Sequence, residues 1–346
     1  MGAENNNDLR EEKLTYHRRV TAFASTSAII VMLGSTLTAS AQTLELRIST
    51  QGPTGTPDTR MVMKFIEELE NDLGDNFEYE FFNTGALGDE IAHMQMIRSG
   101  QIDVYPAGSD VPQLDNNMTV FELPFLFSDR DAVIQALDAG LEDSLRASLR
   151  SAAGVELLAF GEMGFRQIIN NVRPIETPED LEGVKLRVPG NAARQITFTS
   201  FGATPVTMGF SELYLAMQQG TIDGQEGPIA SMQSASFYEV ADYLSLSNHV
   251  YTPVTLLMNG NKFDSLSDEH KEAVLQAARA AAEFSYEQGR IADDEVMAQL
   301  RETMTVNEID YAAFQEAARP VWDEIRPLLD GEIVDTAIAA ASGASN

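Results

Sequence analysis

Three stretches of this sequence decide its fold class: LELRIS at residues 44–49, FEYEFF at 77–82 and IDVY at 102–105. The first alternates apolar and polar residues, as a strand with one buried face does, and all three are predicted strands. Helical spacing of apolar residues separates them, first in a helix that opens at Asp58 or Thr59 and then in a helix over residues 89–98. This β-α-β-α-β order predicts an open, mostly parallel sheet covered by helices.

A second series of strands and helices begins near Gly154. Further strands are expected at 155–160, 165–170, 184–188 and 254–259, and further helices at 192–201, 212–219, 268–302 and 310–329. The helix at 268–302 exceeds the usual length of a globular helix, and its apolar pattern is not a sustained heptad. We therefore expect it to bridge two lobes. The Ala/Ser/Gly-rich residues after Asp335 are expected to be a loosely held end.

The N-terminus has the features of a secretory signal peptide. Three basic residues at 17–19 precede an apolar, small-residue stretch at 20–37, and an A-x-A cleavage pattern follows at 39–41. Cleavage is expected after Ala41. Export of an acidic chain without cysteines suggests the periplasm.

The composition excludes several classes of function. The 346 residues carry a formal net charge of −30, which argues against nucleic acid as a partner, because phosphate binding needs a basic surface. The absence of cysteine excludes thiolate nucleophiles and Cys-ligated metals. The sequence has no P-loop, no dinucleotide-binding glycine motif and no nucleophile elbow, and its four histidines are dispersed. We expect no cofactor, no metal and no catalytic site, although a Ser/His/Asp site assembled in three dimensions stays open.

Two arginines near the ends of predicted strands are the candidate ligand-binding residues. In VKLRV, residues 184–188, the apolar residues share one face of the strand, which places Arg187 on the other face. Pro189 ends this strand, so Arg187 lies at its carboxyl end, where the ligands of open α/β sheets collect. Arg166 has a similar position in GFRQ, residues 164–167.

The chemistry of arginine suits a small organic anion. A guanidinium fork matches a carboxylate with two hydrogen bonds and stays charged when it is desolvated. In a molecule of net charge −30, only a local cation can offset the general repulsion of an anion. The alternative is that both arginines are solvated strand residues or partners of nearby acids, and the sequence pattern alone leaves it open.

Several ordered motifs carry a resemblance to a known family. They are LGDE (87–90), ELPFLF (122–127), GFR (164–166), PEDLEGVKLRVP (178–189), GATPV (202–206), ELY (212–214) and GTIDGQE (220–226). Between residue 44 and about residue 328, the chain resembles the substrate-binding subunit of TRAP (tripartite ATP-independent periplasmic) transporters of the DctP type.

The resemblance implies a two-lobe α/β fold like that of periplasmic binding proteins, with a ligand cleft between the lobes and a long bridging helix. The expected organisation is a signal peptide at 1–41, the first part of lobe I at 42–163, the first part of lobe II at 164–252, a return to lobe I with the bridging helix at 253–292, C-terminal helices of lobe II at 293–330 and a tail at 331–346.

The resemblance also implies the residues of the ligand site. Arg187 matches the arginine that forms the carboxylate salt bridge, and Arg166 matches a second arginine that assists it. The other implied ligand-binding positions are Phe210, Glu90, Gln51 and Gly227. Many members have Asn at the position of Gly227, so a polar contact is lost here and extra room is left. We also expect His93 and Asn170 as candidates for the edge of the cleft.

The implied function is binding rather than catalysis: a periplasmic subunit captures a small organic acid and delivers it to membrane permease subunits. We expect a sugar acid, such as a uronate or an aldonate, because Glu90 suits hydroxyl donors and would repel a second carboxylate. A C4-dicarboxylate, a 2-oxo acid and an aromatic acid remain open. So do a periplasmic enzyme and a sensory binding protein on the same scaffold.

Overall fold

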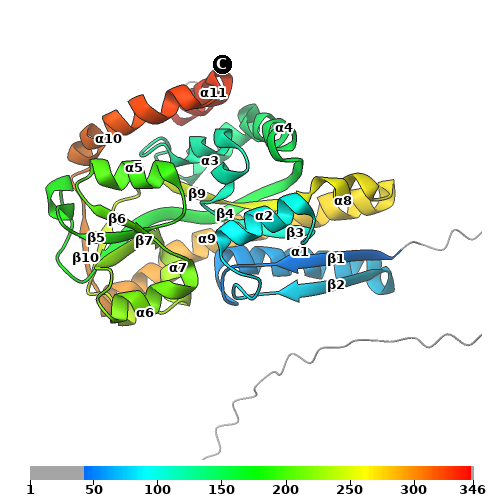
Figure 1. The fold of residues 1–346 in the computed structure, drawn as a ribbon, viewed down its shortest axis with the longest axis horizontal. Helices are drawn as coiled ribbons and strands as arrows, with labels where there is room; N and C mark the ends of the chain where they lie inside the picture. The colour runs from blue at the N-terminus through cyan, green and yellow to red at the C-terminus, as the bar shows by residue number, and fades with distance from the viewer. Residues whose placement is uncertain (1–42, 344–346) are drawn as a thin grey trace, which may run out of the picture. The chain divides into compact units, whose positions relative to one another are not determined.

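The computed structural model describes residues 43–343 (Figure 1). The predicted signal peptide lies outside the described residues. The strands are β1 (Leu44–Ser49), β2 (Phe77–Phe82), β3 (Val104–Ala107), β4 (Val155–Asn170), β5 (Lys185–Val188), β6 (Thr204–Thr207), β7 (Gly224–Pro228), β8 (Tyr243–Leu246), β9 (Tyr251–Asn259) and β10 (Thr305–Glu308). The α-helices are α1 (Pro57–Leu73), α2 (Glu90–Ser99), α3 (Arg130–Ala136), α4 (Glu142–Ala153), α5 (Ala192–Ser200), α6 (Leu213–Gln218), α7 (Ile229–Ser234), α8 (Gly260–Ser265), α9 (Asp268–Thr303), α10 (Tyr311–Ile325) and α11 (Gly331–Ala341).

The strands form one continuous sheet in the order β2-β1-β3-β9-β4-β7-β5-β6, with β8 pairing β4 and β10 pairing β8. The pairs of β1 with β2 and β3, and of β5 with β6 and β7, are parallel as expected. However, β9 runs antiparallel to β3 and β4, and β4 runs antiparallel to β7 and β8. The sheet is therefore mixed rather than mostly parallel, because two long strands return through its middle.

Strand β4 joins the two halves of the sheet. Its residues up to Phe165 pair with β9, and those from Arg166 onward pair with β7. We expected two strands here, but bulges near Leu157 and Glu162 absorb the extra residues, so the strand bends without ending. We call the part built on β1, β2, β3, β9 and the first half of β4 the first lobe. The second lobe is built on β5 to β8, β10 and the rest of β4, and the residue boundaries given above stay a prediction.

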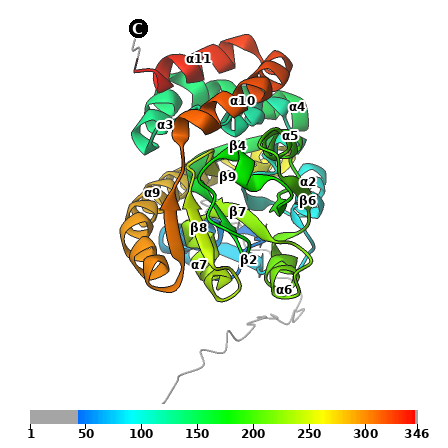
Figure 2. The same cartoon turned by 90° about the vertical axis from the view of Figure 1, so that its left-hand side faces the viewer.

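Helices cover both faces of the sheet in each lobe. Leu157 of β4 belongs to a core with α3, α4 and α11, whereas Leu158 packs with α1 and α9 on the opposite face. In the second lobe, Ile168 packs with α5 and α10, and Ile169 packs with α6, α7 and the end of α9. Figure 2 shows α10 and α11 above the sheet with α3 and α4. The period-2 alternation of a strand thus supplies a separate core on each face.

Helix α9 spans both lobes, as predicted from its length. It has 36 residues and begins after Ser267, whose side chain accepts a hydrogen bond from the backbone of His270. Its first half packs on α1 and β4, and its later part packs on α7 and β10. A close approach is possible because β4 has glycine at 161, where a Cβ would lie 2.5 Å from the sulfur of Met61 and 2.8 Å from Oγ of Ser285.

Three expected elements differ in the structure. The third strand lies at Val104–Ala107, two residues later than predicted. A 3-10 turn over residues 210–212 precedes α6, which therefore begins at Leu213, one residue later than predicted. The end of the chain forms helix α11, capped by Asp330, instead of a loose tail. Its Ile333, Val334 and Ala337 are buried in the core of the first lobe, which explains why an Ala-rich segment is ordered.

No helix among residues 43–343 has the length and apolar character needed to cross a membrane.

The burial of α11 gives a prediction about stability. Ile333→Ala should lower the free energy of unfolding by roughly 2–4 kcal/mol, because it removes buried methylene groups and leaves a cavity. Urea unfolding followed by circular dichroism measures the change, with exposed Glu332→Ala as the control. Equal stability of both variants would mean that α11 does not contribute to the core.

Candidate functional site

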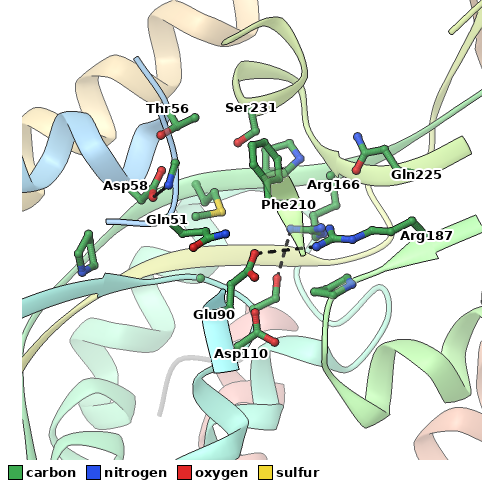
Figure 3. Close-up of a pocket in the computed structure, with 18 of the residues that line it drawn as sticks. Gln51, Thr56, Asp58, Glu90, Asp110, Arg166, Arg187, Phe210, Gln225 and Ser231 are labelled. Atoms are coloured by element: carbon green, nitrogen blue, oxygen red, sulfur yellow. Dashed lines mark hydrogen bonds and ion pairs between the residues drawn. The ribbon is translucent and has the colours of Figure 1, made fainter. Parts of the chain in front are cut away.

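A cavity between the two lobes brings all six predicted site residues together. Its volume is about 630 Å³, including the space open to solvent. Its lining includes Gln51, Glu90, Arg166, Arg187, Phe210 and Gly227. The first lobe contributes the loop after β1 and the starts of α1 and α2, and the second lobe contributes the ends of β5 and β7 (Figure 3).

Arg187 is a buried cation on the second-lobe wall of the cavity. It is 3% exposed and lies next to the end of β5. Its Nε and Nη2 donate hydrogen bonds to the carbonyl oxygen of Met208, at 2.9 and 2.8 Å, which fixes the orientation of the fork. Burial lowers the pKa of Arg187, while Glu90 and Glu226 act to raise it. Within the described chain, the acid in ion-pair range of Arg187 is Glu90, whose Oε1 lies 3.9 Å from Nη2.

Arg166 also lines the cavity, but a buried carboxylate already pairs with it. Glu226 of β7 accepts two hydrogen bonds from its side chain, including one of 3.0 Å from Nη2 to Oε1. Glu226 also accepts from Nη1 of Arg194, at 2.6 Å. The guanidinium of Arg194 in turn pairs with Glu122. Nη1 of Arg166 donates to Oγ of Ser109 across the lobes, at 3.2 Å.

The charges of this network balance. It contains two guanidiniums and two carboxylates, and His249 joins it with Nε2 3.1 Å from Glu226. Burial lowers the pKa of His249 to about 4, so the ring is neutral at pH 7. Burial acts to raise the pKa of Glu226, but Arg166 and Arg194 hold it well below its ordinary value. Arg187 lies outside this neutral network, so its guanidinium is the cation that can pair with a bound anion.

The first-lobe wall is polar and acidic. Gln51 is 7% exposed, and neither its amide oxygen nor its amide nitrogen has a hydrogen-bond partner. Asp58, in the first turn of α1, is 6% exposed, and its Oδ2 accepts from the backbone N–H of Gly52 at 3.3 Å. Burial raises the pKa of Asp58. Glu90 begins α2 and reaches the cavity opposite Arg187 (Figure 3).

Asp110 is a third carboxyl in the lining, and it is buried. It follows β3, and its Oδ1 accepts from the side chain of Gln113 at 3.2 Å. Burial raises the pKa of Asp110 to about 7, and Glu90 adds to this effect while Arg187 opposes it. This carboxyl therefore keeps its proton to a higher pH than an exposed aspartate does.

Phe210 and Gly227 complete the second-lobe wall. The ring of Phe210 packs against Phe237 with centroids 5.5 Å apart. The space beside Gly227 is smaller than we expected, because the side chain of Gln225 lies over it. A Cβ at position 227 would be 3.2 Å from Oε1 of Gln225 and 3.7 Å from Nη2 of Arg166.

Two candidates for the edge of the cleft are not in the lining. His93 is buried behind the cavity, where its Nε2 lies 2.8 Å from Oγ of Ser49 and its ring stacks on Tyr105. The amide oxygen of Asn170 accepts from the backbone N–H groups of Val172 and Arg173, so this residue shapes the turn after β4.

Sequence reasoning missed other lining residues: Asp58, Asp110 and Gln225 among them. Asp110 had a usable signal that we did not apply, because it closely follows the strand predicted at 102–105 and ligands of open α/β sheets bind at the carboxyl ends of strands. Asp58 was considered only as a helix start, and Gln225 only as part of a motif.

Comparison with known proteins places this geometry in a family. The sequence model of the family described as "Bacterial extracellular solute-binding protein, family 7" (DctP) matches residues 48–327. The chain is similar to the 2,3-diketo-L-gulonate-binding periplasmic protein YiaO of Escherichia coli (strain K12), with 34% identity over 259 residues that make up 73% of this chain and 78% of YiaO.

Solved structures agree with the sequence match. The sugar acid binding protein DctPAm from Advenella mimigardefordensis strain DPN7T, in complex with galactonate, superposes with a TM-score of 0.83 and 30% identity, over 88% of this chain and 99% of that chain. A TRAP periplasmic solute-binding protein from Sulfurospirillum deleyianum, with bound succinate, gives a TM-score of 0.80 and 25% identity, over 86% of this chain and 98% of that chain.

The two-lobe α/β fold and its cavity are those of a solute-binding protein. The chain belongs to the DctP family of TRAP periplasmic solute-binding proteins, which confirms the predicted family and fold class.

Asp110 gives a prediction about pH. Its pKa is raised from an ordinary 3.8 to about 7, so the folded state binds a proton more tightly than the unfolded chain does. This contribution to stability is complete below pH 4 and is lost as the pH rises through 7. Asp110→Asn should therefore raise the free energy of unfolding at pH 8, by at most about 4 kcal/mol, and should change it little at pH 4.

Urea unfolding at the two pH values measures this difference. Asp131→Asn, which removes an exposed carboxylate of α3, serves as the control for net charge. A gain in stability that is the same at pH 4 and pH 8 would contradict a raised pKa at Asp110.

Proposed function

We propose that this chain is the periplasmic substrate-binding subunit of a TRAP transporter, which captures a small organic acid and delivers it to membrane permease subunits. The ligand we favour is a sugar acid, such as an aldonate or a uronate. The observation that carries this proposal is Arg187, a buried cation in an inter-lobe cavity whose other arginine is already paired.

The ligand's carboxylate binds the guanidinium of Arg187. The carbonyl oxygen of Met208 accepts hydrogen bonds from Nε and from one N–H of Nη2 of Arg187. The other N–H groups of this guanidinium are the donors for the ligand's carboxylate. A charged hydrogen bond contributes roughly 1.5–3 kcal/mol, whereas a micromolar complex needs about 8 kcal/mol. Arg166 assists ligand binding as part of the cavity wall beside Gly227, because its own charge is already paired with Glu226. Phe210 packs on the carbon chain of the ligand.

The rest of the cavity favours hydroxyl groups over a second carboxylate. Arg187 and Arg166 are the cations of the described lining, and three carboxyls, Asp58, Glu90 and Asp110, share the same space. A dicarboxylate would bring its second charge toward these acids. Relatives whose names specify diketogulonate and galactonate support a sugar acid, and the relative with succinate keeps a C4-dicarboxylate as the runner-up.

Capture depends on closure of the lobes. Polar contacts already cross between them: Oγ of Ser234 donates to the carbonyl of Gly55 at 3.1 Å, and Nδ2 of Asn191 donates to that of Ser109 at 2.8 Å. A ligand that touches Arg187 on one lobe and Glu90 on the other binds the closed form better than the open form, and so shifts the population toward closure.

The proposed role is binding without chemical change. The described lining of the cavity contains no histidine, and His249 is held neutral within the buried network beside it. Incubating the protein with candidate acids and analysing the mixture by mass spectrometry separates a binder, which returns its ligand unchanged, from a periplasmic enzyme.

Replacement of Arg187 tests the anchor. Arg187→Ala should cost roughly 2–5 kcal/mol of binding free energy, because the ligand carboxylate would be buried without its partner. Arg187→Lys should also bind poorly, since an ammonium lacks the planar fork. Titration calorimetry with the tightest acid from a thermal-shift screen of aldonates, uronates and C4-dicarboxylates gives the affinities.

The exposed Arg173→Ala variant is the matched control, because it removes a surface arginine of the second lobe. Affinity of the Arg187→Ala variant equal to that of the wild type would rule out this site.

A further inference from the structure

We propose that Gln225 recognises the hydroxyl group on the carbon next to the ligand's carboxylate, and that glycine at position 227 leaves the space that its side chain needs. This inference rests on the proposed function and deepens it, because it favours 2-hydroxy acids, such as aldonates, over acids without a free hydroxyl at that carbon. Figure 3 shows Gln225 on the same side of the cavity as Arg187.

Strand pairing places Gln225 beside the arginine that anchors the carboxylate. Strands β5 and β7 are parallel, and Arg187 and Gln225 are directly paired residues in their register. Paired residues of neighbouring strands lie about 4.8 Å apart, and their side chains leave the sheet on the same face. Both side chains line the cavity. A group bound to Arg187 therefore has the amide of Gln225 as its neighbour.

The amide of Gln225 has hydrogen-bonding capacity that the protein does not use. The residue is 2% exposed, and within residues 43–343 its side-chain amide makes no hydrogen bond. Gln167, which pairs with Gly227 across β4 and β7, differs, because its amide bonds to Asn248. When a ligand displaces water from the cavity, it must supply the partners of the Gln225 amide, because an unpaired buried polar group is costly.

The donors and acceptors of an amide select a hydroxyl group at this place. Nε2 donates hydrogen bonds and Oε1 accepts them, whereas a hydroxyl group both donates and accepts. In a 2-hydroxy acid this hydroxyl is on the carbon that bears the carboxylate, so it lies close to the side chain next to Arg187. A ring oxygen or a keto oxygen there accepts only, and would leave Oε1 unpaired. The expected preference is thus for an aldonate over a pyranose uronate.

Gly227 makes this position of the amide possible. Residues 225 and 227 lie on the same face of β7, because side chains alternate along a strand. The amide of Gln225 lies over the glycine, where a Cβ at position 227 would be 3.2 Å from Oε1 and 3.5 Å from Nε2. An added methyl group would therefore displace the amide by a few tenths of an ångström. The glycine and the glutamine act as a pair.

Aldonates with and without the C2 hydroxyl test this inference. Galactonate and gluconate are each compared with their 2-deoxy analogues, which lack only that hydroxyl. Titration calorimetry on the wild type should give about tenfold weaker binding for the 2-deoxy acid, because two hydrogen bonds are lost. The Gln225→Ala variant should bind the parent acid and its 2-deoxy analogue equally. The ratio of the two dissociation constants is the readout, since a general loss of structure would weaken both acids without changing it.

The Gly227→Ala variant tests the dependence on the glycine. In the wild-type background it should lower the ratio severalfold, because the methyl group displaces the amide. In the Gln225→Ala background it should leave the ratio unchanged, because the displaced group is absent. The matched controls, which should keep the wild-type ratio, are the exposed Gln276→Ala in α9 and Gly331→Ala in α11, where a Cβ meets no other atom within 4 Å. Thermal unfolding verifies that each variant is folded.

The outcomes separate this inference from the proposed function. Equal binding of the parent and 2-deoxy acids by the wild type, or a ratio that Gln225→Ala leaves unchanged, would overturn the role of Gln225 while Arg187 still anchors the ligand. Binding of a uronate or of succinate without either aldonate would also overturn it, and would leave organic-acid capture standing. If no organic acid binds the wild type, the proposed function itself fails.

Discussion

One buried carboxylate, Glu226, is shared by two arginines, and the rest of the site depends on this sharing. It joins Arg166 of β4 to Arg194 of α5, and Glu122 completes the charge balance from the segment that precedes α3. Removing one partner from such a network leaves an uncompensated buried charge, which costs several kcal/mol. Because these four groups neutralise one another, Arg187 faces the cavity outside the network, with the carboxylate of Glu90 at 3.9 Å from its Nη2.

One residue of this ion-pair network also belongs to the strand that joins the two lobes. Arg166 lies where β4 changes partners from β9 to β7, so the switch between the lobes and the wall of the cavity share a residue. Helix α9 packs against both lobes. A ligand held by Arg187 on one side and by the polar wall on the other adds the contacts that favour the closed arrangement.

Local signals predicted much of this fold, whereas long-range pairing did not follow from them. The helix starts predicted at residues 89, 192 and 268 were correct to within one residue, because each helix begins with a local signal, a side-chain cap that acts within three residues. The continuity of β4 was missed, because its glycines suggest breaks and only the neighbouring strands carry it through the bulges. Helix α11 was missed, because its Ala-rich sequence gains order only from the core that it covers.

In the site, too, residues marked by local patterns were predicted and long-range ion pairs were not. Strand alternation and the following proline identified Arg187, but the Arg194–Glu226 pair spans 32 residues and the Arg194–Glu122 pair spans 72, and no local pattern indicates either.

The central claim is that Arg187 holds the carboxylate of the ligand, and a crystal structure of the complex with the tightest-binding acid tests it most directly. The account predicts both carboxylate oxygens within hydrogen-bond distance of the Arg187 guanidinium, with Arg166 still paired to Glu226. A carboxylate bound elsewhere in the cavity, with Arg187 contacting only Met208 and Glu90, would contradict it.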